Sequence, residues 1–140
     1  MRPTLTHLAL HVPDLQACID FYGRFCGMRV IHERAGKGSK IVWMCEPGKE
    51  HEFIFVIMPG GVDRNLPATD YSHFGFAVES REAVDAIAQQ ALQAGCLIWP
   101  PRDEPYPVGY YCGLRDPAGN YVEFSYGQPL GPGSEAMPIP

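Results

Sequence analysis

The chain has 140 residues, of which 46% are hydrophobic, enough to bury a core in one domain or in two small modules. Its formal net charge of -5 comes with no basic stripe, which excludes a nucleic-acid partner and disfavours anionic membranes. No run approaches about 18 apolar residues, and Arg2, Pro3 and His7 interrupt the segment where a signal peptide needs an apolar core. These features predict a cytoplasmic protein.

The five cysteines form an odd set without CxxC spacing. Most of them sit within apolar runs, where a reduced thiol behaves as a small core residue. A disulfide framework and a zinc ribbon are therefore not indicated for Cys18, Cys26, Cys45, Cys96 and Cys112.

The first half reads as β-α-β-β-β. The alternating run Leu5 to Val12 predicts a half-buried strand, with His7, Ala9 and His11 on one face. Asp14 can cap a helix that ends at Gly27. Three further strands are predicted at Arg29 to Glu33, Ile41 to Cys45 and Glu52 to Met58, with turns at Gly36, Gly38 and Gly48.

The same order begins again after Gly61. The run Ser72 to Val78 alternates, and Ser80 can cap a helix that ends before Gly95. The apolar stripe of this helix is expected at Val84, Ile87, Ala91 and Leu92. Strands are predicted at Leu97 to Trp99, Tyr110 to Leu114 and Tyr121 to Tyr126, with a sharp turn at residues 116–120 between the last two.

Superposing the halves places His73 on His7 and Ser80 on Asp14 at the same offset, which favours an internal duplication. We expect an α+β fold of two β-α-β-β-β modules. The modules are assigned to residues 1–62 and 63–126. Residues 127–140 are rich in Gly and Pro and predict a loose tail.

A histidine in the first strand of each half allows two imidazoles to converge when the sheets pair, and Glu123 lies in the closing strand. Two neutral imidazoles and one carboxylate leave several positions open on a divalent ion, which suits iron(II) or manganese, with zinc or nickel as alternatives. Each residue alone has a plainer interpretation as a satisfied or exposed side chain. Together, His7, His73 and Glu123 predict one metal site.

Three segments resemble the vicinal oxygen chelate superfamily, which includes glyoxalase I, bleomycin-binding proteins and extradiol dioxygenases. They are Thr6-His7-Leu8-Ala9-Leu10-His11-Val12-Pro13-Asp14-Leu15, Ser72-His73-Phe74-Gly75-Phe76-Ala77-Val78 and Arg115-Asp116-Pro117-Ala118-Gly119-Asn120-Tyr121-Val122-Glu123-Phe124. The resemblance covers residues 4 to 126. It implies paired modules whose mixed, curved sheets surround a metal-lined cavity, a small-molecule substrate and metal ligands at His7, His73 and Glu123. It also implies a homodimer in which two chains share each site.

Departures from the family pattern separate its branches. Glyoxalase I carries a fourth ligand at the position where this chain has Val56, and Glu52 lies four residues too early, roughly 13 Å along a strand. Dioxygenases and fosfomycin-modifying enzymes carry a tyrosine where this chain has Gly113, although Tyr111 shares that face. No histidine follows His73 to supply a dioxygenase's additional one, and the fosfomycin branch lacks its hydroxyl at Ala9 and its basic residues in the tail.

The sequence therefore favours a metal-dependent enzyme that chelates a small metabolite through two oxygens, leaning towards dioxygenase-like chemistry. Lyase or isomerase chemistry of the lactoylglutathione-lyase type and a non-catalytic drug-binding module remain alternatives. His11 can exchange protons near neutral pH, with cavity lining as its plainer interpretation. Tyr111 can hydrogen-bond the substrate. Both are the candidate catalytic residues.

Overall fold

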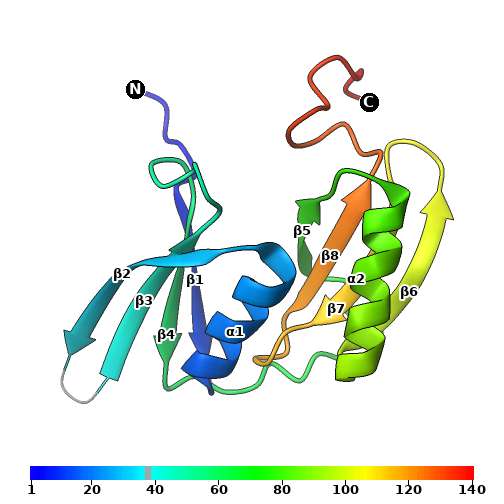
Figure 1. Ribbon diagram of the computed structural model, residues 1–140. Coiled ribbons are helices and arrows are strands. Elements are labelled where there is room, and N and C mark those ends of the chain that lie inside the picture. The colour runs from blue at the N-terminus through cyan, green and yellow to red at the C-terminus, as the bar shows by residue number, and fades with distance from the viewer. Residues whose placement is uncertain (37–38) are drawn as a thin grey trace. The chain divides into compact units, whose positions relative to one another are not determined.

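The computed structural model describes residues 1–36 and 39–140, so the predicted turn residue Gly38 lies outside the described residues. The chain forms two compact units, Met1–Asn65 and Leu66–Pro140, and each is described by itself. Each unit has the order β-α-β-β-β, with its helix on one face of a four-stranded sheet (Figure 1).

The first unit begins with β1 (His7–Val12) and α1 (Leu15–Cys26), followed by β2 (Arg29–Gly36), β3 (Ser39–Cys45) and β4 (Ile54–Pro59). The strand order is β1-β4-β3-β2, with β1 parallel to β4 and the other pairs antiparallel. Asp14 caps α1 by accepting a 3.0 Å bond from the amide of Ala17, and Gly27 ends the helix at φ 64°. Both capping predictions are confirmed.

The second unit repeats this plan with β5 (His73–Ala77), α2 (Arg81–Ala94), β6 (Leu97–Glu104), β7 (Gly109–Arg115) and β8 (Tyr121–Tyr126). Its order is β5-β8-β7-β6, again with one parallel pair, β5 with β8. Ser80 accepts a 3.0 Å bond from the amide of Ala83, and Gly95 ends α2 at φ 75°. The predicted fold class, two mixed sheets from two β-α-β-β-β modules, is confirmed.

Three local predictions are wrong. β4 begins at Ile54, so Glu52 lies exposed in the preceding turn and shares no strand face with Val56. β6 continues to Glu104, five residues beyond the end predicted at Trp99. Leu92 is 61% exposed, because the buried stripe of α2 runs through Val84, Ala88 and Ala91 instead.

The core of each unit lies between its helix and one face of its sheet. α2 packs on β6, β7 and β8, and the β7 and β8 residues Cys112, Leu114, Val122 and Phe124 are buried. The cysteines form no disulfide, and Cys18, Cys45 and Cys112 are fully buried. Burial raises the pKa of the Cys112 thiol to about 12, so this thiol stays protonated.

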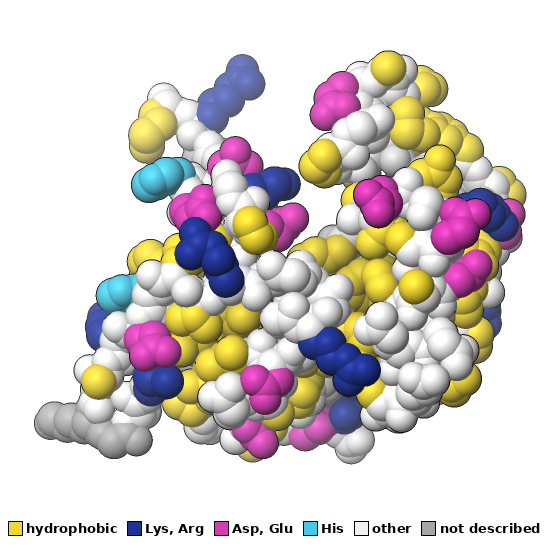
Figure 2. Space-filling model, viewed as in Figure 1, with side chains coloured by type: hydrophobic (Ala, Val, Ile, Leu, Met, Phe, Trp, Pro, Cys, Tyr) yellow, Lys and Arg dark blue, Asp and Glu magenta, His cyan; other side chains and the backbone are white. Residues whose placement is uncertain are grey.

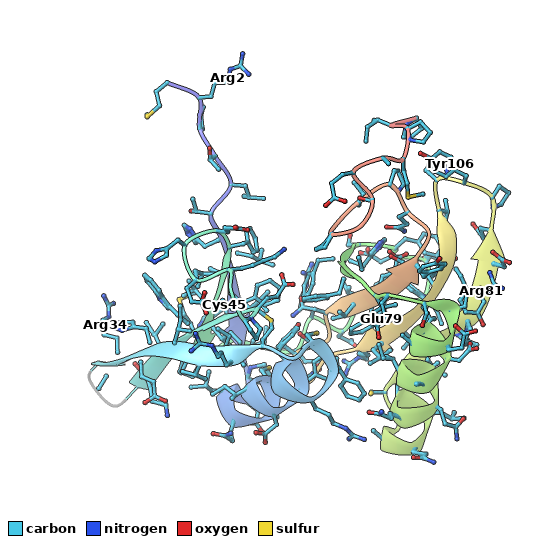
Figure 3. The ribbon with its side chains drawn as sticks, turned by 45° about the horizontal axis from the view of Figure 1, so that its top comes forward. Arg2, Arg34, Cys45, Glu79, Arg81 and Tyr106 are labelled. Atoms are coloured by element: carbon cyan, nitrogen blue, oxygen red, sulfur yellow. The ribbon has the colours of Figure 1, made fainter. Side chains whose placement is uncertain are left out.

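The C-terminal segment, residues 127–140, packs against the second unit and is less loose than its composition predicts. The side chain of Gln128 bonds Glu123, and Pro129 is buried. The hydroxyl of Tyr106 donates to the carbonyl of Pro138 (Figure 3 labels Tyr106). These contacts bring the start of the tail to the exposed face of β5 and β8.

Charged side chains of both signs are scattered over the visible face of each unit (Figure 2). This distribution matches the absence of a basic stripe in the sequence. Among residues 1–36 and 39–140, no helix is long and apolar enough to cross a membrane.

The turn between β7 and β8 is fixed by the buried carboxylate of Asp116. Its Oδ1 accepts bonds of 2.8 Å from the amides of Ala118 and Asn120, and its Oδ2 accepts a 3.0 Å bond from Nδ2 of Asn120. Asp116 is 1% exposed. The turn therefore sets where β8, and with it Glu123, begins.

Replacing Asp116 with Ala leaves three buried donors without their acceptor, and we expect the free energy of unfolding to fall by about 3 kcal/mol. Urea unfolding followed by circular dichroism measures the loss. Asp116→Asn keeps the Oδ1 acceptor and should lose clearly less. Equal losses in the two variants would mean that these hydrogen bonds do not fix the turn.

Candidate functional site

The centre of the candidate site is a histidine-carboxylate pair on neighbouring strands. His73 begins β5, and Glu123 lies in β8, which pairs in parallel with β5 so that Gly75 is opposite Glu123. Nε2 of His73 is 3.8 Å from Oε1 of Glu123. The structure thus brings together two of the three predicted metal ligands within one unit.

The remaining polar atom of each side chain is already engaged. Nδ1 of His73 lies 2.6 Å from the carbonyl oxygen of Tyr71, which can only accept, so Nδ1 carries a proton and, in the neutral ring, Nε2 presents its lone pair. Oε2 of Glu123 accepts a 3.3 Å bond from Nε2 of Gln128. The two atoms that face each other are therefore electron-pair donors, and only a proton or a cation between them makes the arrangement favourable.

Two glycines flank Glu123, which is 8% exposed as a residue. Gly75 and Gly113 lie directly opposite Glu123 on its two neighbouring strands. A Cβ at Gly75 would be 3.2 Å from Oε2 of Glu123. A Cβ at Gly113 would be 2.1 Å from Cε3 of Trp99, so the indole of Trp99 occupies the space over Gly113.

Trp99 also completes an aromatic wall beside the pair. Its ring meets the imidazole of His73 edge to face at 5.6 Å between centroids and the ring of Tyr121 at 5.5 Å. The sequence indicated a missing tyrosine at Gly113, and the structure shows a tryptophan from β6 in its place. A glycine facing a predicted ligand was the signal that could have revealed this.

Two cavities lie on this face and share His73 and Glu123. One of about 250 Å³ is lined by Tyr111, Trp99 and Arg102. The other, of about 500 Å³, is lined by the tail residues Gln128, Leu130 and Gly131. Gln128, Trp99 and Arg102 were not identified from the sequence, because a segment without regular structure and a bulged strand bring them to the site.

Tyr110 faces away from these cavities. Its hydroxyl donates a 2.5 Å bond to Asp85 of α2, and the guanidinium of Arg81 lies over its ring at 4.0 Å. The bond to Asp85 raises the pKa of the Tyr110 phenol above its usual range. Tyr110 therefore packs against the helix.

In the first unit, His7 and His11 lie on the exposed face of β1 together with Ala9, as the alternation predicted. Nδ1 of His7 is 3.0 Å from the hydroxyl oxygen of Thr6. A Cβ at Gly60 would be 3.5 Å from Nε2 of His11. His7 therefore has one ring nitrogen engaged by an upstream residue, as His73 does.

The strand registers of the two units coincide. Ala9 is opposite Val56 in the first unit, as Gly75 is opposite Glu123 in the second. Gly60 and Gly127, which follow these closing strands at the same offset, have φ values of 96° and 93°. Val56 is therefore the counterpart of Glu123, and the first unit offers a histidine but no carboxylate at this place.

The donor set fits a divalent ion. A neutral imidazole nitrogen and a carboxylate oxygen are ligands common to zinc, iron and manganese, and two ligands on one such ion lie roughly 3 Å to 3.5 Å apart. The 3.8 Å separation of His73 and Glu123 needs only a small adjustment. No group of three His, Cys, Asp or Glu side chains able to hold an ion is found within the described residues.

The family is shown by comparison with known proteins. The model of the Glyoxalase/Bleomycin resistance protein/Dioxygenase superfamily matches residues 4–124, and the chain belongs to this superfamily. A protein of Pseudomonas aeruginosa, PA2024, which carries no described function, is 79% identical over all of both chains. The glutathione transferase FosA of Serratia marcescens is 27% identical over 91% of this chain and 83% of its own length.

Solved structures agree on the fold. A possible glyoxalase of Bacillus cereus has a TM-score of 0.65 at 26% identity, covering 86% of this chain and 96% of its own. A mutant of the fosfomycin resistance protein FosX of Listeria monocytogenes, complexed with Mn(II) and 1S,2S-dihydroxypropylphosphonic acid, has a TM-score of 0.72 at 22% identity, covering 91% and 95%. The expected resemblance is thus confirmed at the level of the superfamily.

The close approach of Trp99 to Gly113 generates a prediction. Gly113→Ala places a Cβ inside the indole, and we expect the free energy of unfolding to fall by about 2 kcal/mol. Urea unfolding measures this loss. The matched control is Gly23→Ala in α1, where the nearest atom to the new Cβ is 3.7 Å away; a gain of about 0.5 to 1 kcal/mol is expected there. Unchanged stability of Gly113→Ala would place Trp99 elsewhere.

Proposed function

We propose that the chain is a divalent-metal-dependent enzyme that binds a small metabolite through two oxygens. The observation that carries this proposal is the His73-Glu123 pair, whose Nε2 and Oε1 atoms face each other at 3.8 Å. His7 is the proposed third ligand, since it occupies the position in β1 that His73 occupies in β5. Iron(II) or manganese is the proposed ion.

The bound ion would supply Lewis acidity, stabilising negative charge that develops on a substrate oxygen. The residues of the chain divide the remaining work. Gln128 holds Oε2 of Glu123 so that Oε1 faces His73. Tyr111, which lines the smaller cavity, would donate its phenolic proton to a substrate oxygen, and Nε2 of His11 would take or return a proton.

The proposed reaction class is dioxygenase-like, with a lactoylglutathione-lyase-like lyase or isomerase as the first alternative. Val56 in place of a fourth ligand argues against the glyoxalase I type. A non-catalytic drug-binding protein of the bleomycin-resistance type is the second alternative. It predicts ligand binding without turnover, whereas the proposed enzyme loses turnover when a chelator removes its ion. A homodimer is proposed on the family resemblance.

Elemental analysis tests the ligand set. Protein purified without a histidine tag and reloaded with iron(II), manganese, zinc or nickel should hold about one ion per chain. His7→Ala and His73→Ala should lose it, and Glu123→Gln should bind one to a few orders of magnitude more weakly because the carboxylate charge is gone.

His51→Ala is the matched control for the histidine variants, since His51 is exposed in the turn before β4. Its metal content should equal that of the wild type. Retention of the ion by His73→Ala, or its absence from the wild type, would refute the metal-dependent enzyme.

Gln128 generates a separate prediction as a positioning residue. Gln128→Ala frees Oε2 of Glu123, and we expect the metal affinity to fall about tenfold, as for other partners of metal ligands. Competition with a chelator measures the affinity, and urea unfolding reports any general damage. Gln90→Ala, on the exposed side of α2, is the control and should change neither. Equal metal affinity in both variants would remove Gln128 from the site.

A further inference from the structure

The smaller cavity beside His73 and Glu123 has a lining with a distinct chemistry. Its volume of about 250 Å³ lies below the roughly 300 to 1,000 Å³ of sites for drug-sized ligands. An occupant the size of a single ring with short substituents fits this volume. All of the lining residues belong to the second unit, so the cavity is built within it.

The walls of this cavity are aromatic. Trp99 lies across Gly113, and Tyr111 and Tyr71 complete the lining, with Tyr71 70% exposed. Large rings exposed around a concave space gain free energy when a flat apolar group covers them, by area and by ring stacking. The walls therefore favour a planar, unsaturated body over an extended polar one.

One cation completes the lining. Arg102 lies opposite Tyr111 in the register of β6 and β7 and makes no ion pair within residues 1–36 and 39–140. Its neighbour Asp103 is taken by Arg81, at 2.9 Å (Figure 3 labels Arg81). Glu123 is engaged with Gln128 and faces His73. Arg102 is an exposed residue at the edge of the cavity, where its guanidinium can pair with an anion of a bound molecule, and carboxylates suit its two-pronged geometry.

The larger cavity on the same face makes a useful contrast. It also reaches His73 and Glu123, but its lining within the described chain holds no Lys or Arg, and Phe76 is its single Phe, Tyr or Trp. An anionic ring would find neither a charge partner nor stacking walls there. The smaller cavity has both a cation, Arg102, and aromatic walls.

We propose that the smaller cavity binds an aromatic carboxylate, with the ring against Trp99 and Tyr111 and the carboxylate on Arg102. This inference rests on the proposed function, because it assigns a substrate class to the same site. The end of the ring away from Arg102 would carry the oxygen substituents presented to His73 and Glu123. A small aromatic acid with ring oxygens is therefore the proposed substrate class.

Trp99 is the natural reporter for a test. The chain has two tryptophans, and Trp43→Phe, a change at a 42% exposed position, leaves Trp99 alone. In this variant, treated with a chelator, benzoate should quench the fluorescence of Trp99 saturably in the millimolar range. Benzyl alcohol, which has the ring without the charge, should bind about tenfold more weakly. Cyclohexanecarboxylate, which has the charge without the flat ring, should also bind more weakly.

Substitutions in the same Trp43→Phe background test whether Arg102 causes the preference for benzoate over benzyl alcohol. Adding Arg102→Gln should bring the affinity for benzoate down to that for benzyl alcohol. Adding Arg81→Gln is the matched control, because Arg81 belongs to the same unit but does not line the cavity, and it should leave the preference for benzoate unchanged. The unfolding curves of both variants show whether the fold is kept.

The outcomes separate this inference from the proposed function. No saturable quenching by benzoate, equal affinity for benzoate and benzyl alcohol, or an unaltered preference in Arg102→Gln would overturn the aromatic carboxylate. The metal is absent from these titrations, so a failure to bind an ion in the elemental analysis would refute the enzyme and leave this result standing. Benzoate binding lost only with Arg102 supports the inference.

Discussion

The parallel pairing of the first and last strands of each unit is the constraint on which the site depends. In the second unit it sets β5 beside β8, so that His73 and Glu123 project from neighbouring strands onto the same face. The helix that links β5 to β6 covers the opposite face and buries Cys112 and Phe124. One face is thereby used for stability, and the other remains available for chemistry.

The carboxylate of Glu123 is placed by what surrounds it as much as by its own strand. Gly75 leaves it room, Gln128 holds one oxygen, and the Asp116 turn fixes where its strand begins. These contacts come from three separate segments of the chain. A site assembled in this way tolerates little change in any one of them, because each neighbour limits the same side chain.

The fold could be predicted largely from the sequence, whereas the surroundings of the site could not. The fold follows from local signals: the alternation in β1, the caps Asp14 and Ser80, and the glycines that end both helices. Each of these depends only on residues that are close together in the sequence. Trp99 reaches Gly113 through irregular pairing between β6 and β7, and Gln128 arrives from a segment without regular structure. Such contacts depend on tertiary packing, which periodicity does not encode.

The positions of Val56 and Glu123 differ in their neighbouring residues as well as in their own side chains. Glu123 stands between two glycines, but Val56 stands between Ala9 and Trp43. A glutamate introduced at 56 would meet the side chains of Ala9 and Trp43 on the two neighbouring strands, so a second carboxylate ligand could not be added to the first unit by a single exchange. The two halves share a backbone plan, but a carboxylate fits the first half only if Ala9 and Trp43 are exchanged for smaller residues together.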